Sequence, residues 1–297
     1  MSDELKPPII LFGNFRSGTT MLQNIIATHP AVVPFYEPVG LWLYADPRRN
    51  NDEFDESDAT EEVKRYIRGR FVKYQRENGN RVIVEKTPHN ILRIPFVRAI
   101  FPEAHFIYIV RNPLSFVSSV ELKWQRPVGT RRIRKRLKTT PVTQLHHYLG
   151  RLLKQQWNSR VLRRKYLPIW GPRYRGIEQD LKENDLLTVI ARQWAHASRK
   201  AERDLAQFDP GQVLRLKYED FVENPPSHLQ RICDHCELQM TSEMARQVQE
   251  FVKTDRTHKW KRFEPRELAR ILPELSDEMR RLGYGIPADI AEATGVS

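Results

Sequence analysis

Residues 13–20 read GNFRSGTT, and the two glycines have the spacing of a phosphate-binding P-loop, G-x-x-x-x-G-K-[ST]. The backbone amides of such a loop and the positive end of the following helix bind anions. Here Thr19 stands where the pattern has lysine, and the cation lies inside the loop at Arg16. In a nucleotide kinase that lysine reaches the β- and γ-phosphates. The loop therefore fits a ligand that has no β/γ pair and that needs no metal ion.

The other residues of the loop supply neutral donors. Gly13 and Gly18 let the backbone approach a ligand closely, and Ser17, Thr19 and Thr20 add hydroxyl groups. An adenylate whose departing phosphate carries a sulfuryl group fits this donor set. The transferred group has a single formal charge, so amides and one or two cations in a preorganised site can stabilise the charge that develops.

The elements around the loop alternate between strands and helices. Apolar runs predict strands at 7–12, 31–35, 81–85, 105–110 and 213–216. Helical spacing predicts helices at 20–28, 61–77, 90–101, 114–124, 184–207, 225–236 and 264–282, with another near 142–166. This order predicts an α/β, three-layer P-loop-type fold with a central parallel sheet flanked by helices. We interpret residues 1–297 as one domain, with a basic loop and helical insertion at 126–183.

Ligands of such folds bind outside the carboxyl ends of the strands. Arg16, Glu37, Lys86 and Arg111 lie at or just past the ends of the predicted strands. Although they are far apart in sequence, the architecture brings such positions to one edge of the sheet.

Two segments resemble the sulfotransferases that use 3′-phosphoadenosine 5′-phosphosulfate (PAPS). FRSGTTML is similar to their 5′-phosphosulfate loop, and FIYIVRNPLSFVSSV is similar to their 3′-phosphate segment. The resemblance implies that Arg16, Ser17, Gly18, Thr19 and Thr20 bind the 5′ end of the nucleotide. It implies that Arg111 and Ser119, eight residues apart, bind the 3′-phosphate: arginine offers a charged fork and serine a short donor. Asn112 stands where the family often has aspartate.

Further matches resemble the tyrosylprotein sulfotransferases and their bacterial relatives. Their catalytic glutamate lies 21 residues after the loop arginine, which is Glu37 in FYEP, and their catalytic lysine matches Lys86 in EKTP. Glu37 would then be the general base that takes the proton of the acceptor hydroxyl, and Lys86 would stabilise the bridging or an equatorial oxygen. His89 is the alternative base, because small-molecule sulfotransferases use a histidine shortly after an equivalent lysine. Capping of the next helix is the other role open to His89.

The same resemblance places three more residues near the nucleotide. LKYEDFVENP matches a strand end that carries a tyrosine, here Tyr218. HKWKRF resembles the segment that closes over PAPS, with Lys259 and Trp260 as the matching pair. The matches cover residues 8 to about 125 and about 190 to 285. No metal ligand set is implied.

The net charge of +12 is concentrated in one segment. From Leu122 to Ile177 there are sixteen Lys and Arg and no Asp or Glu, which leaves 33 basic against 37 acidic residues elsewhere. Such a segment could be a solvated loop, bind an anionic acceptor, or contact an anionic membrane surface. The sequence alone does not decide between these three roles of the basic segment.

The sequence thus predicts a PAPS-dependent, metal-independent sulfotransferase that acts on a hydroxyl or amine of a small molecule, glycan or peptide. A nucleotide kinase with an atypical P-loop and a non-catalytic binder of nucleic acid or another anionic polymer are the alternatives. The first does not explain Thr19, and the second does not explain Arg111, Ser119 and Glu37. No apolar run approaches the ~20 residues that cross a membrane. Because MSDELKPP lacks the pattern of a signal peptide, we expect a cytoplasmic protein.

Overall fold

A computed structural model of the chain describes residues 4–124, 171–252, 259–286 and 290–291. Within them, five parallel strands form one sheet in the order β2-β3-β1-β4-β5. The strands are β1 (Ile9–Phe12), β2 (Val32–Tyr36), β3 (Val82–Lys86), β4 (His105–Val110) and β5 (Val213–Lys217). Because β1 is central, the loop that follows it is flanked by the ends of β3 and β4.

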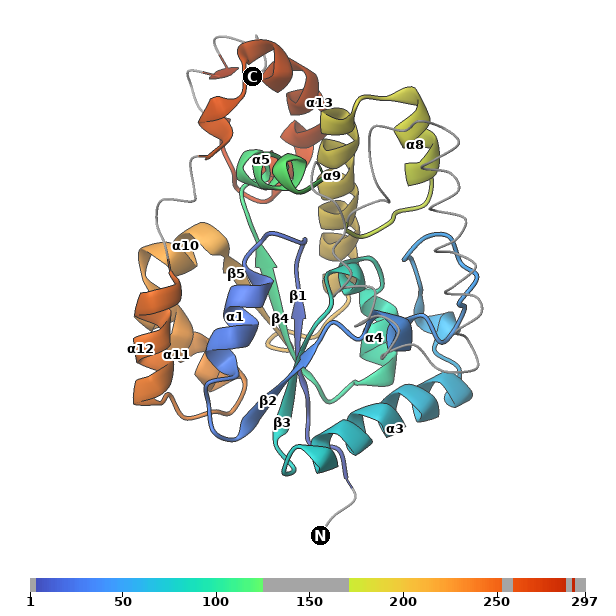
Figure 1. The fold of residues 1–297 in the computed structure, drawn as a ribbon, viewed down its shortest axis with the longest axis vertical. Helices are drawn as coiled ribbons and strands as arrows, with labels where there is room; N and C mark the ends of the chain where they lie inside the picture. Colours follow the sequence, from blue (N-terminus) through green and yellow to red (C-terminus); the bar gives the residue numbers. More distant parts are fainter. Residues whose placement is uncertain (1–3, 125–170, 253–258, 287–289, 292–297) are drawn as a thin grey trace.

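Helices cover both faces of this sheet, which gives three layers (Figure 1). One face packs against α1 (Thr19–Ile26), α10 (Tyr218–Glu223), α11 (Pro225–His235) and α12 (Ser242–Phe251). The other packs against α3 (Glu61–Glu77), α4 (Ile94–Ile100), α5 (Pro113–Trp124), α9 (Leu186–Leu205) and α13 (Pro265–Arg281). The shorter elements are α2 (Val39–Trp42), η1 (Glu56–Asp58), η2 (Pro88–Leu92), α8 (Ile177–Glu183) and η5 (Lys259–Arg262).

The central strand shows why the chain needs two apolar layers. Side chains alternate along a strand, so Ile9 and Leu11 enter the core beneath α1, whereas Ile10 and Phe12 enter the core beneath α9. All four are buried. A strand that is apolar on both faces belongs in the middle of a covered parallel sheet, which is where β1 lies.

The predicted fold class is confirmed, and each predicted strand is present within two residues. The helix predicted at 90–101 is instead two elements, η2 and α4. Pro95 lacks an amide hydrogen and is tolerated only in the first turn of a helix, so α4 begins at Ile94. The helix expected near 142–166 and most of the 126–183 insertion lie outside the described residues.

The end of that insertion is part of the packed fold. Gly171 has a positive φ of 84° and lies against the ring of Phe15 in the glycine loop. The carbonyl of Pro172 accepts a hydrogen bond of 2.7 Å from Nε2 of the buried Gln193 on α9. Residues 171–183 therefore connect the glycine loop with α8 and α9.

Candidate active site

The glycine loop joins β1 to α1 and has a conformation that depends on its glycines. Gly18 has a φ of 100°, and a Cβ there would lie 2.7 Å from the ring of Tyr218. A Cβ on Gly13 would meet the Ile109 carbonyl oxygen at 2.6 Å. Arg16 also has a positive φ, 71°, which is uncommon for a residue with a side chain. The tight fit explains why glycines occupy both positions.

The loop is anchored from both sides. The hydroxyl of the buried Ser17 donates to the Asn14 carbonyl at 2.5 Å, and Nδ2 of Asn14 donates to Ser198 Oγ on α9 at 3.1 Å. On α1, Nε2 of the buried Gln23 donates to the Val84 carbonyl at 3.0 Å. These bonds fix the loop and its helix relative to α9 and β3. Thr19 is buried and Thr20 is exposed at the start of α1.

The two segments predicted to bind opposite ends of the nucleotide meet in the structure. Nε of Arg16 donates to Ser119 Oγ at 3.0 Å, and Nη1 of Arg111 donates to the Arg16 carbonyl at 3.0 Å. The Arg111 guanidinium is buried and lies 4.3 Å from the ring centroid of Tyr218. Arg16, Gly18, Arg111, Ser119 and Tyr218 thus form one cluster, hereafter the basic cluster.

Glu37 and Lys86 form a second group at the ends of neighbouring strands. Tyr36 pairs with Lys86 in the β2–β3 register, so Glu37 follows directly at the edge of the sheet. Lys86 Nζ lies 2.5 Å from Glu37 Oε1. The lysine side chain is only 4% exposed and the glutamate side chain is 44% exposed. The carboxylate is therefore the member of the pair that an incoming molecule can reach.

Sequence reasoning missed Glu85, which precedes Lys86 and points to the opposite face of the sheet. Its buried carboxylate accepts hydrogen bonds from Trp42 Nε1 at 3.2 Å, Thr87 Oγ1 at 2.5 Å and Asn90 Nδ2 at 3.2 Å. Burial raises the pKa of Glu85 to about 7. The available signal was the position of Glu85 within β3: in a parallel sheet covered on both faces, a polar side chain inside a strand points into an apolar layer.

His89 lies in η2, and its surroundings differ from those of Glu37. Burial alone would raise the pKa of Asp52, but the charges of Arg173, His89 and Arg93 hold it well below its usual range. Asp52 also accepts hydrogen bonds from the backbone and side chain of Arg173, at 2.8 and 3.0 Å. The structure thus places His89 near the Asp52 carboxylate.

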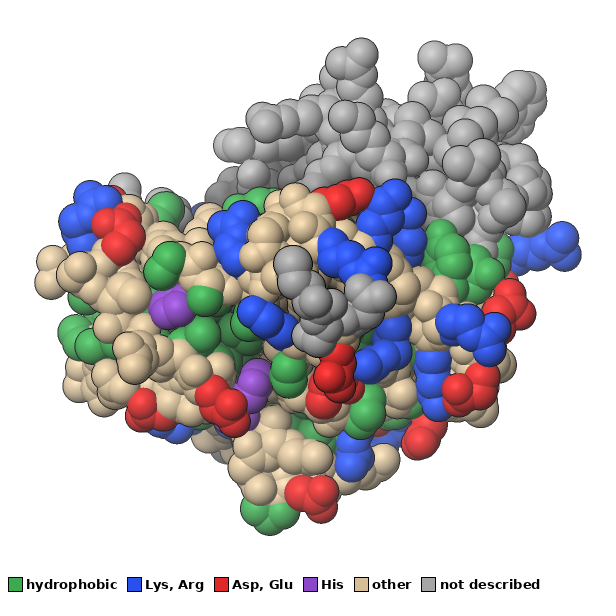
Figure 2. Space-filling model, turned by 90° about the horizontal axis from the view of Figure 1, so that it is seen from below, with side chains coloured by type: hydrophobic (Ala, Val, Ile, Leu, Met, Phe, Trp, Pro, Cys, Tyr) green, Lys and Arg blue, Asp and Glu red, His purple; other side chains and the backbone are tan. Residues whose placement is uncertain are grey.

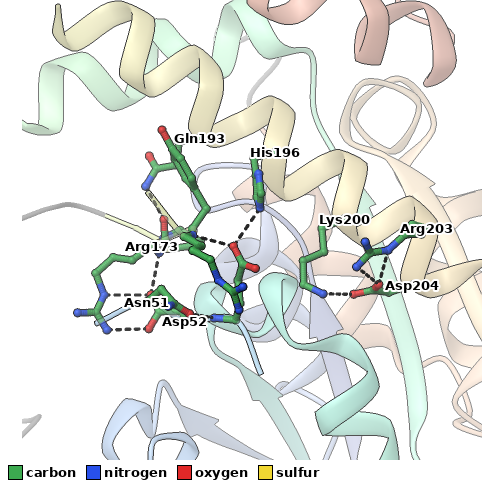
Figure 3. A network of polar contacts seen from close by, with 12 residues as sticks. Asn51, Asp52, Arg173, Gln193, His196, Lys200, Arg203 and Asp204 are labelled. Atoms are coloured by element: carbon green, nitrogen blue, oxygen red, sulfur yellow. Dashed lines mark hydrogen bonds and ion pairs between the residues drawn. The ribbon is translucent and has the colours of Figure 1, made fainter. Parts of the chain in front are cut away.

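Figure 3 shows how the 51–53 loop is fixed to α9 and to the residues after 170. Glu53 Oε1 lies 3.1 Å from Nε2 of His196 and accepts from the Arg175 amide at 2.7 Å. Burial alone would raise the pKa of Glu53, but these hydrogen bonds lower it to about 2. Further along α9, Lys200 and Arg203 pair with Asp204 at 2.8 and 3.0 Å. These ion pairs and hydrogen bonds stabilise the fold beside the candidate site.

The last predicted pair, Lys259 and Trp260, lies in η5. Arg262 of the same element donates to Ser118 Oγ at 3.0 Å and pairs with Glu121, so η5 packs against the helix that carries Ser119. Trp260 is buried. The segment therefore lies beside α5, next to the basic cluster.

A separate pocket of about 240 Å³ lies between α8, α9 and α13. Its lining includes none of the residues that the sequence singled out: Tyr174, Asp180, Arg192, Ala195, His196, Arg199 and Glu274. Arg192 pairs there with both Asp180 and Glu274 at 2.9 Å. Because its acids neutralise its arginines, this pocket is a poorer anion site than the basic cluster.

Comparison with known proteins gives the following similarities. The family described as "Sulfotransferase family" matches residues 7–183 and 171–242. The Nodulation protein NoeE of Sinorhizobium fredii is 26% identical over 150 residues, which cover 44% of this chain and 36% of that protein. An uncharacterised protein of Aquifex aeolicus is 22% identical over 93% of this chain and 33% of its own length. The chain spans about a third of the length of these relatives.

Two solved structures share the fold. The sulfotransferase domain from the curacin biosynthetic pathway has a TM-score of 0.60 at 17% identity, covering 96% of this chain and all of that domain. The sulfotransferase domain from the Synechococcus PCC 7002 olefin synthase has a TM-score of 0.54 at 13% identity, covering 96% and 97%. Among the described residues, no helix is both long and apolar enough to cross a bilayer, and no three side chains form a metal-ligating group.

Proposed function

Because the chain belongs to the sulfotransferase family, we propose that it transfers a sulfuryl group from PAPS to a hydroxyl or amine of an acceptor. One observation carries the proposal: Arg16 bridges the two predicted phosphate-binding segments through Ser119 and Arg111. A nucleotide with phosphates at both its 3′ and 5′ positions has charges for both segments.

The glycine loop and the basic cluster fit a nucleotide with phosphates at both its 3′ and 5′ positions. The loop backbone at Gly13 and Gly18 has no room for a Cβ, as expected where amides approach a phosphate closely. The buried Arg111 offers its guanidinium to the 3′-phosphate, with Ser119 as the second donor. The ring of Tyr218 lies against Arg111 and supports the guanidinium that would bind the 3′-phosphate. Lys259 and Trp260 would close the nucleotide site from the side of α5.

We assign Glu37 as the general base and Lys86 as the cation at the reacting centre. The acceptor oxygen forms a bond to sulfur while the bond from sulfur to the phosphate oxygen breaks, and Glu37 takes the acceptor proton. Lys86 and Arg16 stabilise the negative charge that develops on the transferred group and the departing phosphate. The Lys86–Glu37 contact of 2.5 Å orients the carboxylate before the acceptor arrives. His89, beside Asp52, is the alternative base.

A thermal-shift experiment tests the nucleotide assignment. Adenosine 3′,5′-bisphosphate (PAP) at about 100 times its Kd in EDTA should raise Tm by on the order of 5 °C. Mg-ATP at the same concentration should do little. The variant Arg111→Gln should lose the PAP effect, whereas Arg246→Gln, on the exposed surface of α12, should keep it. Stabilisation by Mg-ATP but not by PAP would replace the proposal with the kinase alternative.

A second experiment identifies the acceptor class. The enzyme and sulfur-labelled PAPS are incubated with a library of metabolites, glycans and peptides, and the labelled products are separated. Transfer to at least one hydroxyl or amine is expected. Binding of PAP without any transfer would favour a non-catalytic role.

A further inference from the structure

The β4–β5 pairing extends beyond the ends of the two strands. The register pairs Val110 with Lys217, and the next two positions also contact each other. The Arg111 guanidinium stacks on Tyr218, and the Asn112 amide donates to Glu219 Oε1 at 3.1 Å. Two successive contacts thus attach the turn that carries Arg111 to the first residues of α10.

The other oxygen of Glu219 binds a third segment. Glu219 Oε2 accepts a hydrogen bond of 2.9 Å from the hydroxyl of Tyr284, which follows α13 and is 8% exposed. Lys217 Nζ donates to the Gly283 carbonyl at 3.2 Å and lies 5.0 Å from the Tyr284 ring centroid. One carboxylate therefore connects the turn after β4, the start of α10 and the segment after α13.

Asn112 transmits this constraint to Ser119. Its Oδ1 accepts from the amides of Leu114 and Ser115, at 3.0 and 3.3 Å, which satisfies two of the unpaired donors at the start of α5. The backbone of Asn112 is held by Glu219, and its side chain holds the helix that carries Ser119. Arg111 precedes Asn112 directly. A displacement of this turn would therefore move both predicted ligands of the 3′-phosphate.

We propose that Glu219 is a positioning residue that, anchored by Tyr284, fixes the turn that carries Arg111 and leads into the helix of Ser119, and thereby selects nucleotides with a 3′-phosphate. This inference rests on the proposed function, because it assumes that these two residues bind that phosphate. The two hydrogen bonds of Glu219 join the turn to Tyr284, and we therefore assign it an indirect action on the nucleotide.

The test compares the affinity for PAP with the affinity for adenosine 5′-monophosphate (AMP), which lacks the 3′-phosphate, by calorimetry without metal or acceptor. The ratio of the Kd for AMP to the Kd for PAP measures the contribution of the 3′-phosphate to binding. In Glu219→Ala the ratio should fall at least tenfold, with the Kd for AMP within threefold of wild type. Glu223→Ala, an exposed carboxylate of the same helix, is the matched control and should leave the ratio unchanged.

Two conservative variants separate positioning from general destabilisation. Glu219→Gln should keep the ratio within threefold of wild type, because the amide oxygen can accept from Asn112 and the amide group can donate to the Tyr284 hydroxyl. Tyr284→Phe keeps the Asn112 bond but loses the anchor, so its ratio should fall at least fivefold, beyond the threefold limit set for Glu219→Gln. This variant decides the matter if Glu219→Ala cannot be purified.

The outcomes distinguish the two proposals. An equal loss of PAP and AMP affinity in Glu219→Ala, or an unchanged ratio, would overturn the positioning role and leave the proposed function intact. An unchanged ratio in Tyr284→Phe would likewise overturn the anchored positioning that we propose. A wild-type protein that binds AMP as tightly as PAP would overturn both.

Discussion

At the scale of single residues, the Glu37–Lys86 pair combines an accessible base with a buried cation. Glu37 has a φ of 41°, which is rare for a non-glycine residue and costs of order 1–3 kcal/mol where the surroundings enforce it. The contact with Lys86 is one constraint that fixes the carboxylate. Strained backbone conformations of this kind cluster at active sites, where they cost stability and contribute to function.

We predict that Glu37→Ala lowers kcat by about 10²- to 10⁴-fold, the usual contribution of a general base. The Kd for PAP should stay within about threefold of wild type, since Glu37 is absent from the basic cluster. Turnover is measured with labelled PAPS and an acceptor from the library, and PAP binding by calorimetry. Glu61→Ala, in the exposed first turn of α3, serves as the control. Normal turnover in Glu37→Ala would direct attention to His89.

Glu85 makes stability depend on pH in an unusual direction. Burial raises its pKa from 4.5 to about 7, so the folded state prefers the protonated carboxyl. Its contribution to stability is complete below pH 4.5, decreases as the pH rises, and is lost above about 7. A shift of one pKa unit corresponds to about 1.36 kcal/mol, so the loss in the free energy of unfolding is on the order of 3 kcal/mol.

Glu85→Gln should abolish this dependence, because a neutral amide resembles the protonated carboxyl. We expect the free energy of unfolding to fall between pH 5 and 8 in wild type by up to about 3 kcal/mol more than in the variant. Urea denaturation at several pH values measures the difference. Glu53→Gln is the control: the pKa of Glu53 is lowered to about 2, so its contribution is complete above pH 4.5, and this variant should run parallel to wild type between pH 5 and 8. Parallel curves for wild type and Glu85→Gln would contradict this account.

At the scale of elements, the loop between β1 and α1 must keep both its conformation and its contact with Tyr218. Gly18→Ala would introduce a Cβ at 2.7 Å from the Tyr218 ring at a φ of 100°. Gly79→Ala has a similar φ, 73°, with nothing within 4 Å of the new Cβ. Both variants should lose about 1–2 kcal/mol from left-handed strain. Only Gly18→Ala should also lose at least tenfold in PAP affinity, measured by calorimetry; equal PAP affinity in both variants would refute this role for Gly18.

The elements that the sequence predicts correctly are those with local signals. The glycine loop follows an apolar strand, and α3 has regular apolar spacing after its Thr60 cap, so its bounds match the prediction at both ends. The Glu37 and Lys86 positions follow from strand ends and from family resemblance, and the structure brings them into contact.

The roles that sequence reasoning missed depend on distant partners. Glu219 contacts residues 107 positions before it and 65 after it, and no local pattern distinguishes it from an exposed helix carboxylate. Asp52 and Arg173 are likewise 121 positions apart. Such pairs are specified by the assembled sheet, so only the three-dimensional structure reveals them.

At the scale of the whole molecule, charge is divided between the basic stretch and the remainder of the chain. The face at the amino ends of the strands, where α3 lies, mixes basic and acidic side chains (Figure 2). The sixteen basic residues of 122–177 have no acidic neighbours in sequence, and most lie outside the described residues. The stretch begins in the helix that carries Ser119, and its described last part, 171–177, starts with Gly171 beside Phe15 of the glycine loop.

The stretch starts in α5, and its described last part lies beside the glycine loop. We therefore expect the basic stretch to bind a reactant and not only to affect solubility. Reversing Arg131, Arg132, Arg134 and Arg136 to glutamate should raise the KM of an anionic acceptor at least tenfold, with the Kd for PAP within threefold. The effect should shrink as salt is added, since screening shortens the reach of these charges. The matched control reverses four exposed residues of α3, namely Arg65, Arg70, Lys73 and Arg76. Equal effects of the two sets on KM would mean that net charge alone matters, and an unchanged KM in both would exclude the stretch from acceptor binding.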